Sequence, residues 1–226
     1  MTIRVPLIVS TILILAMLAA SAYAWTVLPA DVRIAVHWNA AGHVNGYAHK
    51  PFALLFGPAF AVGLSALLAV LPLIEPRKLN LAASGKFYAA AWIGIVAILG
   101  VAHGAIVATA LHVRLDVGAV VTSAVSVLFI VIGNFIGKSH SNFFAGIRTP
   151  WTLSSEYAWE HANRLAGRLF MASGAATLVA ILIFASKFAL FILFGLTVAS
   201  CVAAVAMSYV YWRRDPERSP GNGAMR

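Results

Sequence analysis

The chain has 226 residues and a formal net charge of +9, with 62% hydrophobic and only 10% charged residues. An ordinary soluble domain has about 25% charged residues, so this composition excludes a soluble fold that buries its apolar surface in one core. The basic residues are scattered through short segments between apolar runs, which argues against a nucleic-acid-binding face. The sequence predicts an all-α polytopic membrane protein.

Six apolar stretches are long enough for membrane helices, which need about 20 mostly apolar residues each. Lys187 alone separates the last two stretches, which predicts a tight helical hairpin. Glycines one turn apart, Gly100 with Gly104 and Gly133 with Gly137, predict close contacts between helix backbones. The six stretches cover residues 6–27, 52–74, 87–111, 117–136, 166–186 and 188–212.

The spans divide the chain into a first transmembrane helix, an extracytoplasmic loop module, two helices with a cytoplasmic loop, a three-helix region and a cytoplasmic tail. The three-helix region contains a second cytoplasmic loop, residues 138–165. An Ala-Tyr-Ala run also imitates a signal-peptide cleavage site, so cleavage of residues 1–24 stays open. Because the apolar run continues past it, we expect this span to be retained. The five regions are residues 1–27, 28–51, 52–116, 117–212 and 213–226.

The loop at residues 28–51 is predicted to form a small ordered cap. Apolar and polar residues alternate over residues 32–39, which indicates a short strand with one apolar face. Gly42 and Asn45–Gly46 supply turn chemistry. We expect the apolar face, including Trp38, to rest on the helix ends. His37, His43 and His49 stand six residues apart and match no standard metal-ligand spacing, so no metal site is expected.

The second loop, residues 138–165, is predicted to contain a rigid turn followed by a helix. Pro150 and Trp151 indicate the turn, since Trp favours the membrane interface. Ser154 or Ser155 can cap a helix whose first turn holds Glu156.

Charged residues then recur every four positions along that predicted helix, at Glu156, Glu160, Arg164 and Arg168. Glu160 precedes Arg164 in the order that favours an ion pair. This stripe is either a solvated face near lipid phosphates or a docking surface for another protein.

Two segments resemble a known family. The first, within residues 28–50, resembles an extracytoplasmic module of unknown function, and the second, within residues 133–167, resembles the SdpI family of bacterial immunity proteins. The chain departs from the usual pattern at Asn45, where an acidic residue is common, and at Asn163, where His is common. The matching residues are His37, Trp38, Asn39, Gly42, Gly46, Tyr47, Asn134, Asn142, Gly146, Arg148, Thr149, Pro150, Trp151, Trp159 and Arg164.

The resemblance implies a multi-pass protein of the bacterial plasma membrane that protects a cell from a secreted killing peptide. It also implies capture of a cytoplasmic winged-helix repressor, with membrane lipids as the other partner and no direct contact with nucleic acid. No cofactor and no enzymatic activity are expected, because the common catalytic motifs are missing. The alternative is a small-solute or proton-coupled transporter, for which His103 is the clearest mid-membrane candidate.

Topology is the first testable expectation. Twelve of the 16 Lys and Arg residues lie in the cytoplasm if the N-terminus does, as the positive-inside rule requires. Reporters fused after Arg226, between Arg77 and Lys78, and within residues 138–165 should report the cytoplasm, and a reporter near Gly42 should report the outside. A cytoplasmic signal from the Gly42 fusion would overturn this topology.

Overall fold

The computed structural model describes residues 3–184 and 186–218 of the chain. Within these residues, six helices are long and apolar enough to cross a membrane, which confirms the predicted fold class and a multi-pass membrane protein. A two-stranded sheet and short helices occupy the connections. The six long helices are α1 (Arg4–Val27), α2 (Lys50–Ile74), α4 (Gly85–Ala110), α5 (Val117–Ile136), α7 (Glu156–Phe184) and α8 (Ser186–Arg213).

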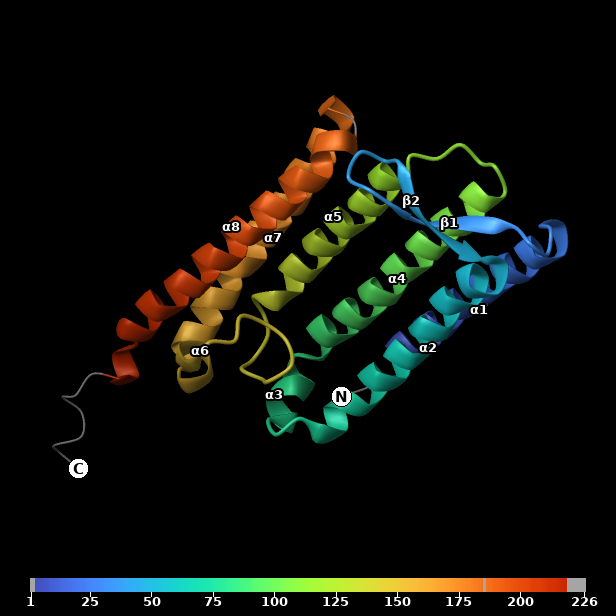
Figure 1. Cartoon of the computed structure of the whole chain (residues 1–226). Coiled ribbons are helices and arrows are strands. Elements are labelled where there is room, and N and C mark those ends of the chain that lie inside the picture. The colour runs from blue at the N-terminus through green and yellow to red at the C-terminus, as the bar shows by residue number, and fades with distance from the viewer. Residues whose placement is uncertain (1–2, 185, 219–226) are drawn as a thin grey trace, which may run out of the picture.

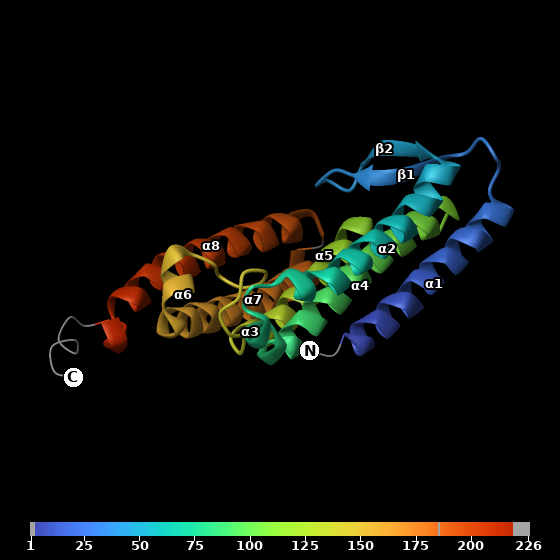
Figure 2. The same cartoon turned by 90° about the horizontal axis from the view of Figure 1, so that it is seen from below.

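The long helices pack in two groups of three (Figure 1). One group contains α1, α2 and α4, the other contains α5, α7 and α8, and contacts between α4 and α5 join them. The sheet lies across one end of the bundle, here called the hairpin end (Figure 2). The short helices α3 (Lys78–Ala83) and α6 (Pro150–Ser154) lie at the opposite end, here called the loop end.

The cap at the hairpin end contains two strands rather than the single predicted one. β1 (Arg33–Trp38) pairs antiparallel with β2 (Val44–His49). Asn45–Gly46 was predicted to form a turn, and this is wrong, because both residues lie in β2. The chain reverses earlier, at Gly42, whose φ of 81° is a left-handed conformation that favours glycine.

The apolar face of β1 rests on the helix ends, as predicted, but Ile34 provides the deepest contact. Ile34 is 2% exposed and packs with Ala24 of α1, Leu54 of α2 and Val107 of α4. Trp38 is only partly buried. The sheet is therefore fixed to three helices with Ile34 at the centre of the contact and Val32, Val36 and Ala48 packed around it.

The closest helix crossing joins α5 to α7. A Cβ on Gly133 would lie 2.5 Å from the Gly167 carbonyl oxygen, and one on Gly167 would lie 2.4 Å from the Gly133 carbonyl oxygen. One turn further on, a Cβ on Gly137 would lie 3.0 Å from Cα of Arg164. The Gly133 and Gly137 pair therefore forms the predicted contact. The Gly100 and Gly104 prediction is wrong, since a Cβ at either position meets nothing within 4 Å.

The helices differ from the sequence-based expectation in three ways, two of them at the loop end. The rigid turn at Pro150 and Trp151 is the first turn of helix α6. The charged stripe and the fifth span form one continuous helix, because no proline interrupts residues 156–184. At the other end of the bundle α8 begins at Ser186, so Lys187 lies within α8 rather than between the last two helices; residue 185 lies outside the described part.

The α5–α7 crossing generates a test of packing. Gly167→Ala should lower the stability of the folded protein by about 1–3 kcal/mol, because the added methyl meets backbone that cannot move aside cheaply. Gly104→Ala adds the same methyl to open space in α4 and should leave stability unchanged or slightly raised. Thermal unfolding of the purified variants in detergent measures both. Equal melting temperatures for the two variants would contradict the crossing.

Candidate functional site

The loop that follows α5 folds around the amide of Asn142, which is fully buried. Its Oδ1 accepts hydrogen bonds from the backbone N–H groups of Phe144 and Ala145, at 3.0 and 2.8 Å. Its Nδ2 donates to the His140 carbonyl oxygen at 2.9 Å. An Asn side chain that hydrogen-bonds backbone a few residues away replaces the pairing of regular structure. Asn142 therefore gives this irregular segment one defined shape.

The next part of the loop is seated on α7 through Gly146, Trp159 and Asn163. Gly146 has φ 122°, and a Cβ there would lie 2.8 Å from Asn163 Oδ1 and 3.0 Å from the Trp159 ring. Asn163 Oδ1 accepts from the Ile147 N–H at 2.7 Å, and Trp159 Nε1 donates to the Ser139 carbonyl oxygen at 2.8 Å. Only glycine fits both the backbone conformation and the space at position 146.

The loop ends in a capped helix. Thr149 and Thr152 form a capping box at the start of α6, and Pro150 occupies its first turn, where a missing N–H costs nothing. The Thr149 hydroxyl also lies 3.1 Å from the Ser208 hydroxyl of α8. Trp151 packs edge-on against Tyr209, with ring centroids 5.2 Å apart. Thr149 and Trp151 therefore fix the loop to α8.

The segment between α2 and α3 also holds the loop, through residues that the sequence did not single out. Glu75 is fully buried and its carboxylate accepts from the N–H groups of Arg77 and Phe143, at 2.9 and 3.2 Å. The Arg77 guanidinium donates to the Ser141 hydroxyl and the Leu153 carbonyl oxygen, and lies 5.0 Å from the Phe143 ring centroid. The pattern Glu-Pro-Arg at the end of an apolar span is the available sequence signal.

Two basic motif residues project from this framework. Arg148 is exposed and its Nη1 donates to the Phe143 carbonyl oxygen. Glu160 instead pairs with Arg164 at 2.5 Å, as predicted from their spacing. Ser155 is the predicted helix cap, since its hydroxyl accepts from the Ala158 N–H.

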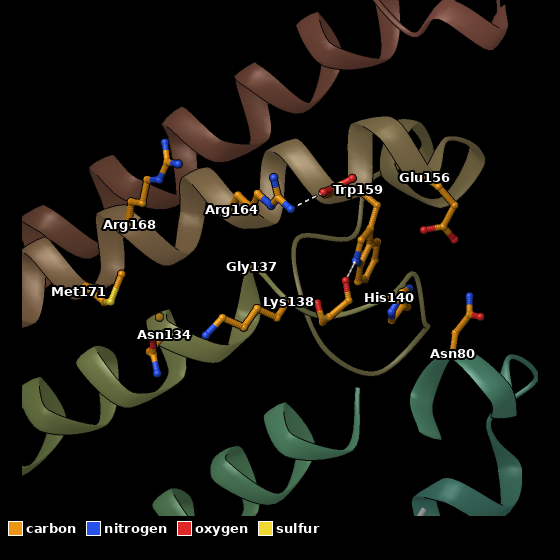
Figure 3. Close-up of a pocket in the computed structure, with 13 residues that line it drawn as sticks. Asn80, Asn134, Gly137, Lys138, His140, Glu156, Trp159, Arg164, Arg168 and Met171 are labelled. Atoms are coloured by element: carbon orange, nitrogen blue, oxygen red, sulfur yellow. Dashed lines mark hydrogen bonds and ion pairs between the residues drawn. The ribbon is translucent and has the colours of Figure 1, made fainter. Parts of the chain in front are cut away.

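A cleft of about 950 Å³ opens between the end of α5 and the first half of α7. Figure 3 shows Lys138 directed toward Asn134, the Arg164–Glu160 pair on α7, and the hydrogen bond from Trp159 of α7 to the Ser139 carbonyl oxygen of the loop. Three predicted site residues, Asn134, Trp159 and Arg164, line this cleft. Arg148 does not line it.

A second cleft at the loop end is acidic. It lies where the start of α7 approaches the end of α8 and the short helix η1 (Pro216–Arg218). Four of the seven acidic residues of the chain line it, and its described lining contains no lysine or arginine. The Ser155 hydroxyl donates to Asp215 at 2.5 Å and ties its two sides together. The four acidic residues are Glu156, Glu160, Asp215 and Glu217.

At the hairpin end, three motif residues build the turn and the strand pair. Asn39 Oδ1 accepts from the N–H groups of Ala41 and His43, both at 3.0 Å, and Gly42 supplies the left-handed position. A Cβ on Gly46 would lie 2.9 Å from the His37 Cβ on the paired strand, so glycine is required there. Asn39, Gly42 and Gly46 are therefore explained by the hairpin itself.

The remaining motif residues of the hairpin are accessible. Tyr47 is 58% exposed, and His37 is exposed with its Nδ1 2.6 Å from Asn45 Oδ1. His37, Trp38 and Asn39 line a pocket whose other wall is formed by mostly apolar residues of α4, α5 and α8. His49 hydrogen-bonds to Arg33. No group of three or more His, Cys, Asp or Glu side chains within the described residues is placed to hold a metal ion.

Comparisons with known proteins agree with these two regions. The SdpI/YfhL protein family matches residues 138–211, and a domain of unknown function, DUF1648, matches residues 12–62. "Immunity protein SdpI" of Bacillus subtilis (strain 168) is 26% identical over 102 residues, which are 45% of this chain and 48% of that protein. The matched segment thus spans about half the length of this relative. No solved structure matches the chain. The chain therefore combines a DUF1648 region, which includes the hairpin, with an SdpI/YfhL region, which includes the loop that follows α5.

Proposed function

We propose that this protein is a membrane immunity protein that protects a bacterium from a secreted killing peptide. The observation that carries the proposal is the matched SdpI/YfhL region, folded into a rigid loop and capped helix at one end of six apolar helices. The relative named above is an immunity protein. The charge distribution along the chain supports a hairpin end outside the cell and a loop end in the cytoplasm.

The hairpin end is the part proposed to meet the peptide. Its pocket combines the polar rim of His37 and Asn39 with the apolar walls of Ile106 and Val121. A peptide that attacks membranes needs apolar side chains, and a pocket of mixed character can bury one while its rim hydrogen-bonds the backbone. The exposed Tyr47 adds an aromatic side chain of the kind enriched in binding surfaces.

The loop end is proposed to capture a cytoplasmic winged-helix repressor, as in the system that gave the family its name. A DNA-binding protein carries a basic surface for phosphate groups. The acidic cleft at Glu156, Glu160, Asp215 and Glu217 has the complementary charge on a chain that is otherwise strongly basic. The same patch would repel DNA, in keeping with a protein that binds the regulator and not its operator.

Cross-protection tests the immunity role. Expressed in Bacillus subtilis cells that lack Immunity protein SdpI, the chain should raise survival under their killing peptide at least about tenfold over empty vector. Membrane insertion is verified first by fractionation. An inserted protein that gives no protection would contradict the proposed function.

Arg148 tests whether the loop motif serves this function. Arg148→Lys keeps the charge but loses the planar fork that binds a carboxylate in bidentate fashion. We expect normal amounts of folded protein and survival reduced at least about tenfold. Arg214→Lys, the same change at an exposed arginine just after α8, should have no effect on survival. If survival falls only in proportion to folded protein, the role of Arg148 is structural.

The acidic cleft gives a separate test of repressor capture. Neutralising Glu156 and Glu217 to Gln should weaken binding of the Bacillus subtilis repressor by about tenfold at low ionic strength, with a smaller difference at high salt. Asp31→Asn removes the same kind of charge beside the hairpin and should leave binding unchanged. Binding is measured by pull-down on the purified membrane protein in detergent. Equal binding by all variants would rule out this cleft as the docking surface.

A further inference from the structure

The start of α4 lies in an open groove at the loop end, together with the start of α1 and the end of α5. The groove has a volume of about 790 Å³, and most of its wall is apolar, with contributions from Val5, Phe87 and Phe135. Among the described residues that line it, Lys86 and Lys138 carry the only charges. Two exposed ammonium groups thus share an apolar groove that contains no described carboxylate.

A hydrogen bond joins the two segments that carry these lysines. The Ser84 hydroxyl, just before α4, accepts from the His140 N–H at 2.8 Å. This contact is two residues away from Lys86 on one side and two residues away from Lys138 on the other. The Lys138 Nζ also lies 5.9 Å from the centroid of the Phe135 ring, so its charge is beside an apolar wall of the groove.

Neither lysine forms an ion pair within the described part of the chain. The ion pair at the loop end joins Arg164 to Glu160 instead. Lys138 also lines the cleft between α5 and α7, and that cleft contains Glu156 and Glu160. These carboxylates repel an anion, so an anion is favoured on the α4 side of Lys138, where Lys86 adds a second positive charge.

The groove lies at the boundary of the apolar spans. The apolar stretches of α1 and α4 begin at Pro6 and Phe87, and that of α5 ends at Ile136. Lys86 comes one residue before its stretch and Lys138 two residues after its own, so both lie at the same edge of the membrane. The hydrocarbon core ends at this level, and the headgroups of the lipids lie just beyond it.

We propose that this groove binds an anionic phospholipid through its phosphate group. The phosphate lies between Lys86 and Lys138, and an acyl chain follows the apolar wall at Phe87 and Phe135 into the bilayer. A zwitterionic lipid binds less tightly, because the two ammonium groups repel its cationic headgroup. This site differs from the general lipid contact of the spans, and it is separate from the toxin-facing and repressor-binding surfaces of the proposed function.

Native mass spectrometry of the whole protein in neutral detergent tests the site. The two probes, dioleoylphosphatidylglycerol and dioleoylphosphatidylcholine, share their acyl chains and differ in the charge of the headgroup. The first phosphatidylglycerol molecule should bind at least about tenfold more tightly than the first phosphatidylcholine, since each lysine near the headgroup adds its own attraction. Equal affinities for the two lipids would overturn the proposal.

Two double variants locate the site. Lys86→Gln with Lys138→Gln should reduce the preference for phosphatidylglycerol to within about twofold, and both positions are exposed, so the protein should still fold. The control, Lys78→Gln with Arg214→Gln, removes the same charge from exposed positions at the loop end that do not line the groove, and it should keep the preference. An equal loss in both variants would indicate attraction by overall charge and would contradict the site.

Competition with a soluble headgroup identifies the occupant. Glycerol 3-phosphate carries a phosphate and a glycerol group but no acyl chain. In excess, it should leave the phosphatidylglycerol bound, because it cannot use the apolar wall of the groove. Full displacement of the lipid would identify a site for a soluble phosphate and would overturn the assignment to a phospholipid.

Discussion

Lipid offers no hydrogen-bonding partner to a peptide group, and the arrangement of this chain depends on that constraint. Within the six spans the backbone is helical, and several buried hydroxyls donate their hydrogen to a carbonyl oxygen of the preceding turn. Ser126 donates to the Thr122 carbonyl oxygen and Thr177 to that of Ser173, both at 2.8 Å. The irregular backbone and the sheet are confined to the two ends, where water and neighbouring segments can pair them. Both candidate sites are therefore at the ends.

The α5–α7 crossing determines the shape of the loop end. Because Gly133 and Gly167 let the two backbones touch, the end of α5 is brought against the first turns of α7. The loop that leaves α5 then runs over Trp159 and Asn163, which hold it through its own backbone. A wider crossing would leave Trp159 without the Ser139 carbonyl. Packing inside the membrane thus sets the geometry of a surface outside it.

The sequence predicts best what depends on local chemistry. The spans follow from hydropathy, the Glu160–Arg164 pair from spacing, and the helix start from the Ser155 cap. The second strand was missed because Asn45–Gly46 has the composition of a turn, although Gly46 is required by the His37 side chain across the sheet.

Contacts between distant segments could not be predicted in the same way. Glu75 and Arg77 bind residues more than 60 positions later in the chain. The residues next to them in the sequence do not indicate which partners they bind. Spacing alone also failed to separate the Gly100 and Gly104 pair from the Gly133 and Gly137 pair. Only the second meets a neighbouring backbone.

Most of the motif residues hold the backbone of the sites in place, and their side chains are not available to bind a partner. Asn142, Gly146, Thr149 and Trp159 are committed to contacts within the chain, while Arg148 is exposed. A fixed backbone reduces the freedom that an exposed side chain loses on binding, so rigidity of the loop favours selective pairing by Arg148. The buried Glu75 contributes in the same way, since it anchors Phe143, whose carbonyl oxygen orients the Arg148 guanidinium. A change at Glu75 would therefore act on binding through the direction of Arg148, although Glu75 itself is inaccessible to any partner.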